Sequence, residues 1–559
     1  MGTPVDWDPR ALMAAVGDRL DLVEAPFTLP GSRLLVFRHG DGIRVNTAEY
    51  ERRLDDCVVL ESLVVRDGSG GVLPITGVLP AVVEFGGRVT LGFDGVSVLS
   101  IGLADGRREH ATVEWRVPGG GVERAAVTAS GAVRLSVADD RRVVVTDTGN
   151  EEHATALSAS EAVWIAWFTR CPVVRDDLQP MTAFCWWVLG ANIVDLPALG
   201  GARAVVPSKI GYVGLWQWDA YFIAVGLRHG DPELAREQLD LAFRFPGADG
   251  QLPDVVHEHG VLASSDDLPI GDRENLRRAG SQVADPDAAV PLTKPPLAAW
   301  ALRKVAERGA DPAWLRRQLE TVRRSQDWWF AASDLDGDGL PEYGHPYSSG
   351  LDDSPIFDGP IPTTSPDLAA YLIVQDREIA AMLDGFGETD AAAAHRARAE
   401  GTSALLLDLW DADAERFRAL GAGRPLPSYA VVSLLPLLTG SLPEAIAARL
   451  VAALEAADEF ATPWGVPTVA VGDADFSPER MWRGPVWINI NALLVDGLDA
   501  SGYPDAARRL AERTVALVQH GGGPHEYFNP YTGEKAATAT TAFGWSAALF
   551  VDLAVRLSA

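Results

Sequence analysis

The first part of the chain, from about residue 27 to about residue 165, consists of short β-branched runs separated by Gly, Asp and Asn. Runs that alternate apolar and polar positions between turn residues are typical of antiparallel strands. The pattern therefore predicts an N-terminal antiparallel β-sandwich domain over residues 1–170, without a visible cluster of reactive side chains. The predicted strands are RLLVF, CVVLESLVV, AVVEF, RVTLGF, VSVLSIGL, ATVEWRV, AVRLSV, RRVVVTD and AVWIAWF.

After about residue 176 the apolar positions follow helical spacing, and Asp231-Pro232 and Asp311-Pro312 mark two helix starts with proline in the first turn. Short and long links alternate between the helices, which favours helical hairpins arranged in a ring. We predict a mainly α catalytic domain over residues 176–559, an (α/α)6 barrel whose long loops open at one end. The predicted helices span residues 178–195, 218–229, 232–245, 294–308, 312–333, 365–385, 389–410, 427–437, 442–457, 485–501, 504–519 and 543–557.

The composition narrows the partners of the protein. The 48 Lys and Arg against 77 Asp and Glu give a net charge of -29, which would repel nucleic acids and anionic membranes. Cys57, Cys171 and Cys185 have no metal-ligand spacing, so we expect reduced thiols. The N-terminus lacks a basic segment followed by an apolar run, and we expect a cytoplasmic protein. A homo-oligomer stays open.

Seventeen tryptophans favour a sugar ligand, because flat rings stack on sugars, although tryptophan also fills cores. In GLWQWDAYF, Asp219 stands among Trp216, Trp218 and Tyr221 at a predicted helix start. Such a carboxylate can hold sugar hydroxyls between aromatic rings. An N-capping Asp in an aromatic core is the alternative.

Two acidic loops precede the predicted helix at 365–385. In SSGLDDSPIFDGP, Asp352 and Asp353 are adjacent, and their repulsion can keep one of them protonated near neutral pH, as a general acid requires. A solvated turn is the alternative. In DLDGDGLPEY, three alternating acids resemble the start of a calcium loop, although His345 stands where an EF-hand has Glu. These candidate calcium ligands are Asp334, Asp336 and Asp338.

Two segments near the C-terminus carry further candidates. GGGPHEYFNPYTGE sets Glu526 beside Tyr527 in a glycine-rich loop, which suits either a sugar site or a surface turn. MWRGPVWININ adds Arg483 and Trp487 at a helix entrance, where the arginine could bind an anion or pair with an acid.

Taken in order, these segments resemble glycoside hydrolase family 63, which contains processing α-glucosidases and mannosylglycerate and glucosylglycerate hydrolases. The resemblance covers roughly residues 176–559. The matching stretches are WQWDAYF, LTKPPLAAW, DWWFAASDLDGDGLPEYG, SGLDDSP, WRGPVWININ and EYFNPYTGE followed by FGWSAAL.

The resemblance implies an inverting hydrolase of an α-glycosidic, and more specifically α-glucosidic, bond, with Asp352 as general acid and Glu526 as general base. Inversion demands two carboxyl groups about 6.5 to 9.5 Å apart, with room for a water molecule. No cofactor is required for this chemistry, and the partner is a small sugar. The implied substrate-binding residues are Trp216, Trp218, Asp219, Tyr221, Lys294, Tyr347, Arg483, Trp487, Tyr527 and Trp545.

Two positions depart from the family pattern. Asp353 replaces the usual Asn and is expected to raise the pKa of Asp352, while Lys294 stands where glycerate-specific members tend to have Gln. The substrate could therefore be an oligosaccharide or a glycosylglycerate. A trehalase-like hydrolase, a glycoside phosphorylase and a non-catalytic sugar-binding protein are the alternatives.

Overall fold

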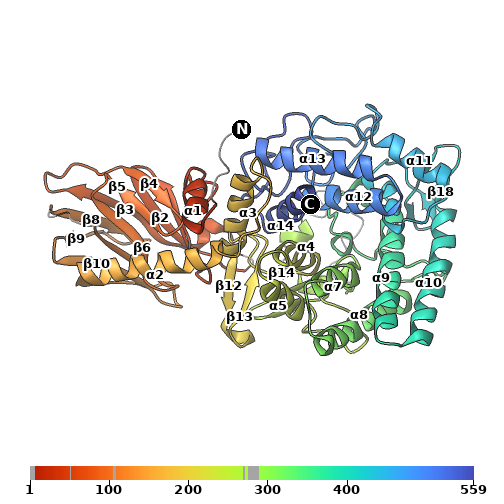
Figure 1. Cartoon of the computed structure of the whole chain (residues 1–559), viewed down its shortest axis with the longest axis horizontal. Coiled ribbons are helices and arrows are strands. Elements are labelled where there is room, and N and C mark those ends of the chain that lie inside the picture. Colours follow the sequence, from red (N-terminus) through yellow and green to blue (C-terminus); the bar gives the residue numbers. More distant parts are fainter. Residues whose placement is uncertain (1–6, 51, 105–106, 108, 269–270, 275–288) are drawn as a thin grey trace. The chain divides into compact units, whose positions relative to one another are not determined.

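The computed structural model describes residues 7–50, 52–104, 107, 109–268, 271–274 and 289–559. Contacts divide the chain into two compact units (Figure 1). The first comprises Met1–Val213, Thr540–Ala547 and Ser558, and the second comprises Gly214–Ala539, Ala548–Leu557 and Ala559. The predicted boundary at residues 170–176 falls within the first unit.

Two antiparallel sheets form most of the first unit, and their facing apolar side chains, such as Val45, Leu63, Leu91 and Leu135, are fully buried. The five-stranded sheet has the order β1 (Leu34–His39), β2 (Gly42–Thr47), β3 (Val58–Asp67), β8 (Ala111–Arg116) and β9 (Val122–Val127). The six-stranded sheet has the order β11 (Val143–Gly149), β10 (Gly131–Val137), β7 (Val98–Leu103), β6 (Val89–Phe93), β5 (Val82–Phe85) and β4 (Ile75–Leu79). The N-terminal antiparallel sheets are thus confirmed.

The last predicted strand is wrong, because AVWIAWF forms the end of a helix, α2 (Asn150–Phe168). Its buried residues recur every three or four positions, which is helical spacing. Trp167 stacks on Trp186 of α3 (Gln179–Ala191) with ring centroids 4.8 Å apart. Each indole N–H donates to the other tryptophan's carbonyl, at 2.8 and 3.0 Å. A seven-residue apolar run fits both periods, and this packing selects the helix.

The first unit also contains α1 (Pro9–Gly17), whose N-terminus is capped by Asp8. A short hairpin, β12 (Ile193–Leu196) with β13 (Ala202–Val205), follows α3. Short 3-10 turns of this unit lie at Leu54–Cys57 and Pro197–Leu199, whereas the 3-10 turn Ser265–Asp267 belongs to the second unit.

The second unit is helical, and neighbouring helices pack as pairs: α4 with α5, α7 with α8, α9 with α10, and α12 with α13. Figure 1 shows α9 and α10 side by side. Asp231 and Asp311 cap α5 and α8 through hydrogen bonds from backbone N–H groups, with proline in the first turn as predicted. These helices are α4 (Gln217–Leu227), α5 (Pro232–Ala242), α7 (Ala298–Ala306), α8 (Pro312–Ala332), α9 (Pro366–Gly385), α10 (Thr389–Asp408), α11 (Glu444–Ala453), α12 (Ile488–Ala500), α13 (Pro504–His520) and α14 (Gly544–Ser558), of which the last begins in the first unit.

The helix predicted over residues 427–437 is wrong, because two 3-10 turns, Val431–Ser433 and Leu435–Thr439, occupy this segment. The N–H of Val431 donates to the carbonyl of Thr468 at 2.9 Å, which draws the chain away from helical pairing. Pro436 lacks an N–H group, and Gly440 ends the second turn with a φ of 60°. The other predicted helices are present.

Short strands and turns lie within the long loops of this unit. They are β14 (Leu215–Trp216), β15 (Val255–His257), β16 (Gly260–Leu262), β17 (Thr363–Thr364), β18 (Trp410–Asp411), β19 (Arg416–Phe417), β20 (Leu420–Gly421) and β21 (Arg424–Pro425), with 3-10 turns η4 (Pro346–Ser349) and η5 (Pro355–Phe357). Across the described ranges, none of the helices has the length and apolar character needed to cross a bilayer.

Candidate active site

Residues 345–358, which we call the acid loop, carry Asp352 between the turns η4 and η5. Gly350 ends η4 with a φ of 70°, and a Cβ there would lie 2.2 Å from the ring of Trp218. Glycine is therefore required for the loop to rest on α4. Burial lowers the pKa of His345 to about 3, so its neutral ring accepts the N–H of Tyr347 at Nδ1, at 3.1 Å.

Burial favours the protonated form of Asp352. Burial raises its pKa to about 8, Lys294 opposes this rise, and the charges of Asp254, Asp353 and Glu526 add to it. Its Oδ1 atom is buried without a hydrogen-bond partner in the described part of the chain. A buried carboxyl group of this kind can donate its proton to a bound molecule.

The segment Glu479–Arg483, which we call the clamp, holds the acid loop. Asp353 accepts the Nε–H of Arg480 at 3.0 Å and the backbone N–H of Trp482 at 2.9 Å. Arg483 donates two hydrogen bonds to Asp358, at 2.8 and 2.5 Å. Of the two roles considered for Arg483, the structure shows the pairing with an acid.

The clamp also holds residues 521–535, which we call the base loop, and the residues just beyond it. Glu479 accepts hydrogen bonds from the side chain of Asn529 and from the N–H of Ala537. Val486 and Phe528 exchange two backbone hydrogen bonds, at 2.8 and 3.0 Å. The base loop carries Glu526, which is only 4% exposed and whose charge acts on Asp352. Two carboxyl groups far apart in the sequence are thereby brought into one site.

Stacked aromatic rings form a wall beside these loops. Trp482 stacks on Trp487 with centroids 3.6 Å apart, and Trp487 stacks on Tyr527 at 4.6 Å. Trp218 lies 5.9 Å from Trp482, which joins α4 to the same wall. The indole N–H of Trp487 donates to the carbonyl of Met481 at 2.8 Å. These rings therefore form one continuous wall that joins α4, the clamp and the base loop.

Asp219 lies in the first turn of α4 and is buried, which raises its pKa well above the ordinary range. The pairing of β14 with β15 places Asp254 next to this turn, where its carbonyl accepts the N–H of Gln217 at 3.0 Å. Lys294 joins Asp254 in an ion pair of 2.7 Å and donates to the carbonyl of Tyr347 at 2.6 Å. Sequence reasoning missed Asp254, because a single acid before a short strand carries no motif.

Two of the predicted binding residues, Tyr221 and Trp545, have other surroundings, and Trp216 directly precedes the turn that carries Asp219. The hydroxyl of Tyr221 donates to Gln217 at 2.7 Å, and its ring faces Phe243 in the core. Trp216 is half-buried at the start of α4. Trp545 is buried and packs against Phe543 within the first unit, with centroids 5.0 Å apart.

The three candidate calcium ligands, Asp334, Asp336 and Asp338, lie close together, with ligand oxygens within 4.8 Å of one another. Asp334 also accepts the N–H groups of Gly337 and Gly339. The cluster suits a hard cation, and its hydrogen bonds also suit a simple turn.

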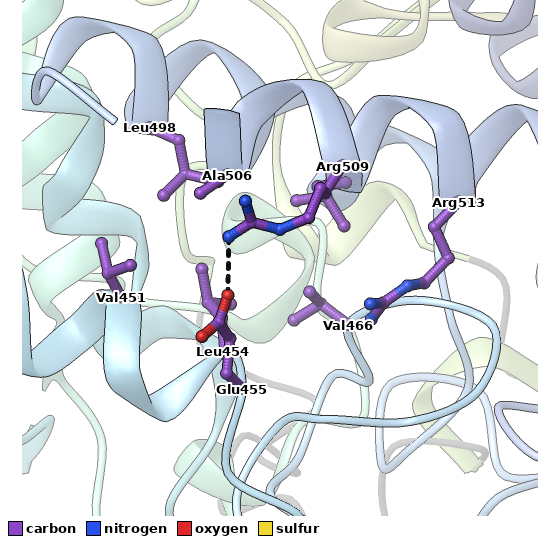
Figure 2. Close-up of a pocket in the computed structure, with 9 residues that line it drawn as sticks. Val451, Leu454, Glu455, Val466, Leu498, Ala506, Arg509 and Arg513 are labelled. Carbon is purple, nitrogen blue, oxygen red and sulfur yellow. Dashed lines mark hydrogen bonds and ion pairs between the residues drawn. The ribbon is translucent and has the colours of Figure 1, made fainter. Parts of the chain in front are cut away.

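A separate hollow lies among α11, α12 and α13 and is shown in Figure 2. Its walls are mostly apolar, and Arg509 pairs with Glu455 at its edge, at 2.7 Å. No residue of the acid loop, the clamp or the base loop lines it. This hollow is therefore separate from the loops that carry Asp352 and Glu526.

A protonated carboxyl group and a second carboxyl group beside an aromatic wall form the arrangement that glycoside hydrolases use. The helical unit and this site define the protein as a glycoside hydrolase. A family model described as "Mannosylglycerate hydrolase MGH1-like glycoside hydrolase domain" matches residues 212–546. The chain belongs to this family, within glycoside hydrolase family 63, as the resemblance implied.

Individual relatives agree with this assignment. The mannosylglycerate hydrolase of Rubrobacter radiotolerans is 27% identical over 417 residues, which cover 62% of this chain and 91% of the relative. A crystal structure of the family 63 mannosylglycerate hydrolase from Thermus thermophilus, with Tris and D-glycerate, is 25% identical with a TM-score of 0.55. The match covers 66% of this chain and 98% of that one.

A further solved structure covers the β unit as well. A bacterial glucoamylase in complex with acarbose has a TM-score of 0.54 and 12% identity, over 100% of this chain and 96% of that one. At this identity the likeness is one of fold alone.

Proposed function

We propose that the protein hydrolyses an α-glycosidic bond, more specifically an α-glucosidic bond, with inversion at the anomeric carbon. The observation that carries the proposal is Asp352, whose pKa is raised to about 8 and on which the charge of Glu526 acts. A carboxyl group that can give a proton and a second carboxyl group near it are what a single displacement requires.

In this mechanism Asp352 protonates the glycosidic oxygen while the bond to the anomeric carbon breaks. Glu526 takes a proton from a water molecule that attacks the opposite face of the sugar. Asp219, in the first turn of α4, binds hydroxyl groups of the sugar that is being cleaved. The aromatic wall of Trp482, Trp487 and Tyr527 gives the sugar an apolar surface.

We propose a glycosylglycerate or a short α-linked oligosaccharide as the substrate. The relatives named above support the former, since two of them are mannosylglycerate hydrolases. Lys294 supports the latter, because its ammonium group is taken up by Asp254 and the carbonyl of Tyr347 instead of facing an open anion site.

The test is to incubate the purified protein with mannosylglycerate, glucosylglycerate and α-linked disaccharides while NMR follows the anomer released. We expect one of these to be cleaved and the β-anomer to appear first. First release of the α-anomer would contradict inversion. Turnover that depends on phosphate would identify a phosphorylase, and binding without cleavage would identify a sugar-binding protein.

We further propose that the paired helices of the second unit close into a ring of six hairpins. We also propose that the loop at residues 334–342 binds a structural calcium ion, which takes no part in the catalytic step. The buried Glu342 adds a fourth carboxylate near Asp334, Asp336 and Asp338. Within the described ranges no Lys or Arg pairs with these four groups, and a divalent cation would supply the missing positive charge.

A further inference from the structure

The ammonium group of Lys294 ties together three segments of the second unit. Lys294 stands in the loop before α7 and is 7% exposed. It pairs with Asp254, which directly precedes β15, and donates to the carbonyl of Tyr347 in the acid loop. The acid loop, which carries Asp352, is therefore held to the segment that contains Asp254 through one buried cation.

Lys294 and Asp254 also oppose each other electrostatically at Asp352. Lys294 favours the ionised form of Asp352, whereas Asp254 favours the protonated form together with Asp353 and Glu526. Asp353 forms an ion pair with Arg480, and the ring of His345 is neutral. Asp219 lies within reach of the ammonium group as well. Lys294 is thus the cation that balances this group of carboxylates.

The ammonium group keeps its charge in this position. Burial opposes the charge of Lys294, but Asp254, Asp352 and Asp219 together raise its pKa above the ordinary value. Burial raises the pKa of Asp254, and the contact with Lys294 works against that rise. Each partner stabilises the charged form of the other, so removal of either one changes the charge that faces Asp352.

We propose that Asp254 and Lys294 are positioning residues, which hold the acid loop through Tyr347 and set the pH up to which Asp352 keeps its proton. Neither residue needs to touch the scissile bond for this role. The inference rests on the proposed function, because it assigns to the pair an effect on the general acid of that reaction.

The two single variants have opposite expected effects. Asp254→Asn leaves the Lys294 cation without its counter-charge, so Asp352 loses its proton earlier, and the alkaline limb of kcat/KM moves down by about one pH unit. Lys294→Gln removes the cation and moves that limb up. Lys294 acts more strongly than Asp254 on Asp352, so the upward direction holds even if Asp254 then takes up a proton.

The measurement is the pH profile of kcat/KM on the best substrate of the parent enzyme. Lys294→Arg keeps the charge and the donors, and we expect its alkaline limb to stay near that of the parent. Asp496→Asn is the matched control, because it breaks the Asp496–Lys304 ion pair of 2.9 Å between α12 and α7, away from the acid loop. This control should change stability and leave the limb in place.

Unchanged limbs in both Asp254→Asn and Lys294→Gln, or shifts in the same direction, would overturn the inference. Thermal unfolding shows whether each variant is folded. If one of the two is not, the direction in which the alkaline limb of the other variant shifts decides. A parent enzyme that cleaves no substrate contradicts the proposed function instead, so the two failures are separate. Lys294→Gln should also lower kcat more than it changes KM, because the anchor at Tyr347 is weakened.

Discussion

Two groups of buried carboxylates in the helical unit differ in how their charge is balanced. Asp552 of α14 pairs with Arg228 at 2.8 Å and with His229 at 2.7 Å. Burial acts to raise the pKa of Asp552, yet these partners hold it well below the ordinary value. Burial also acts to raise the pKa of Asp352, and there the pKa rises to about 8. Burial acts in the same direction at both carboxyl groups, so the charged partners beside Asp552 account for the difference.

The difference separates a structural role from a chemical one. The carboxylate of Asp552 is fully compensated and stabilises the contact between α14 and the end of α4. Lys294 acts on Asp352 and on other acids at once, and within the described ranges the Oδ1 atom of Asp352 has no hydrogen-bond partner. Such a group is unfavourable for folding and useful for proton transfer.

The largest expected effect is the loss of activity when Asp352 or Glu526 is replaced. Asp352→Asn cannot donate a proton, and Glu526→Gln cannot accept one, so each should lower kcat by about 100- to 10,000-fold. Steady-state kinetics on the best substrate measures this. Asp240→Asn is a matched control, because burial also raises the pKa of Asp240, which accepts a hydrogen bond from Trp314 on α8. Parent-like rates in either site variant would contradict the assigned roles.

The next effect is on stability at the balanced group. Asp552→Asn leaves Arg228 buried without its partner, which should lower the free energy of unfolding by about 3 kcal/mol. Chemical denaturation measures this change, and kcat should stay near that of the parent. Asp384→Asn, which breaks an exposed pair with Arg396, should change stability by less than about 1 kcal/mol. Equal losses in both variants would remove the contrast between buried and exposed pairs.

A third effect is the opposite pH dependence of stability in the two groups. The folded state holds the proton of Asp352 up to about pH 8, whereas the unfolded state releases it near its ordinary value of 3.8. The stability that the folded state gains by holding this proton is therefore fully present below about pH 4, and it is lost as the pH rises to about 8. The Tm of Asp352→Asn should exceed that of the parent by a margin that grows across this range.

The same scans on Asp552→Asn sharpen the contrast. Because the folded pKa of Asp552 is lowered, its contribution is present above the ordinary value and is lost only as the pH falls below it. The deficit in Tm of Asp552→Asn should thus persist up to about pH 8, and it should not shrink as the pH falls to about 5, because burial lowers the pKa of His229 and Asp552 acts to raise it. A constant margin for Asp352→Asn over that range would show that its proton is not held.

Sequence reasoning found the parts of the site that have local signals. Asp352 and Glu526 stand in glycine-rich loops beside further acids or aromatic residues, and such combinations are visible within a few positions. Asp254 and Lys294 could not be paired in this way, because their contact depends on the pairing of β14 with β15 and on the path of the loop before α7. Contacts of this kind exist only after the chain has folded.

The same limit explains the two errors in the fold. The run AVWIAWF satisfies both strand and helix spacing, and only the stacking of Trp167 on Trp186 distinguishes them. The segment 427–437 has helical spacing, but the hydrogen bond from Val431 to Thr468 involves a partner distant in sequence. Long helices with a capping Asp before Pro, such as α5 and α8, were predicted correctly because cap and period agree.

The smallest expected effect concerns the third acidic group, at Asp334, Asp336 and Asp338. Within the described ranges no Lys or Arg pairs with these acids, and Asp336 and Asp338 are exposed. If the charge of this group is balanced by calcium, then millimolar calcium should raise the Tm of the parent by a few degrees, because the ion binds the folded state only. The double variant Asp336→Asn with Asp338→Asn removes two ligands and should lose this response, while its kcat stays unchanged.

The variant Asp384→Asn should respond to calcium like the parent. An equal response in the double variant would place the ion elsewhere, and no response in the parent would show that hydrogen bonds from Gly337 and Gly339 suffice to hold the loop.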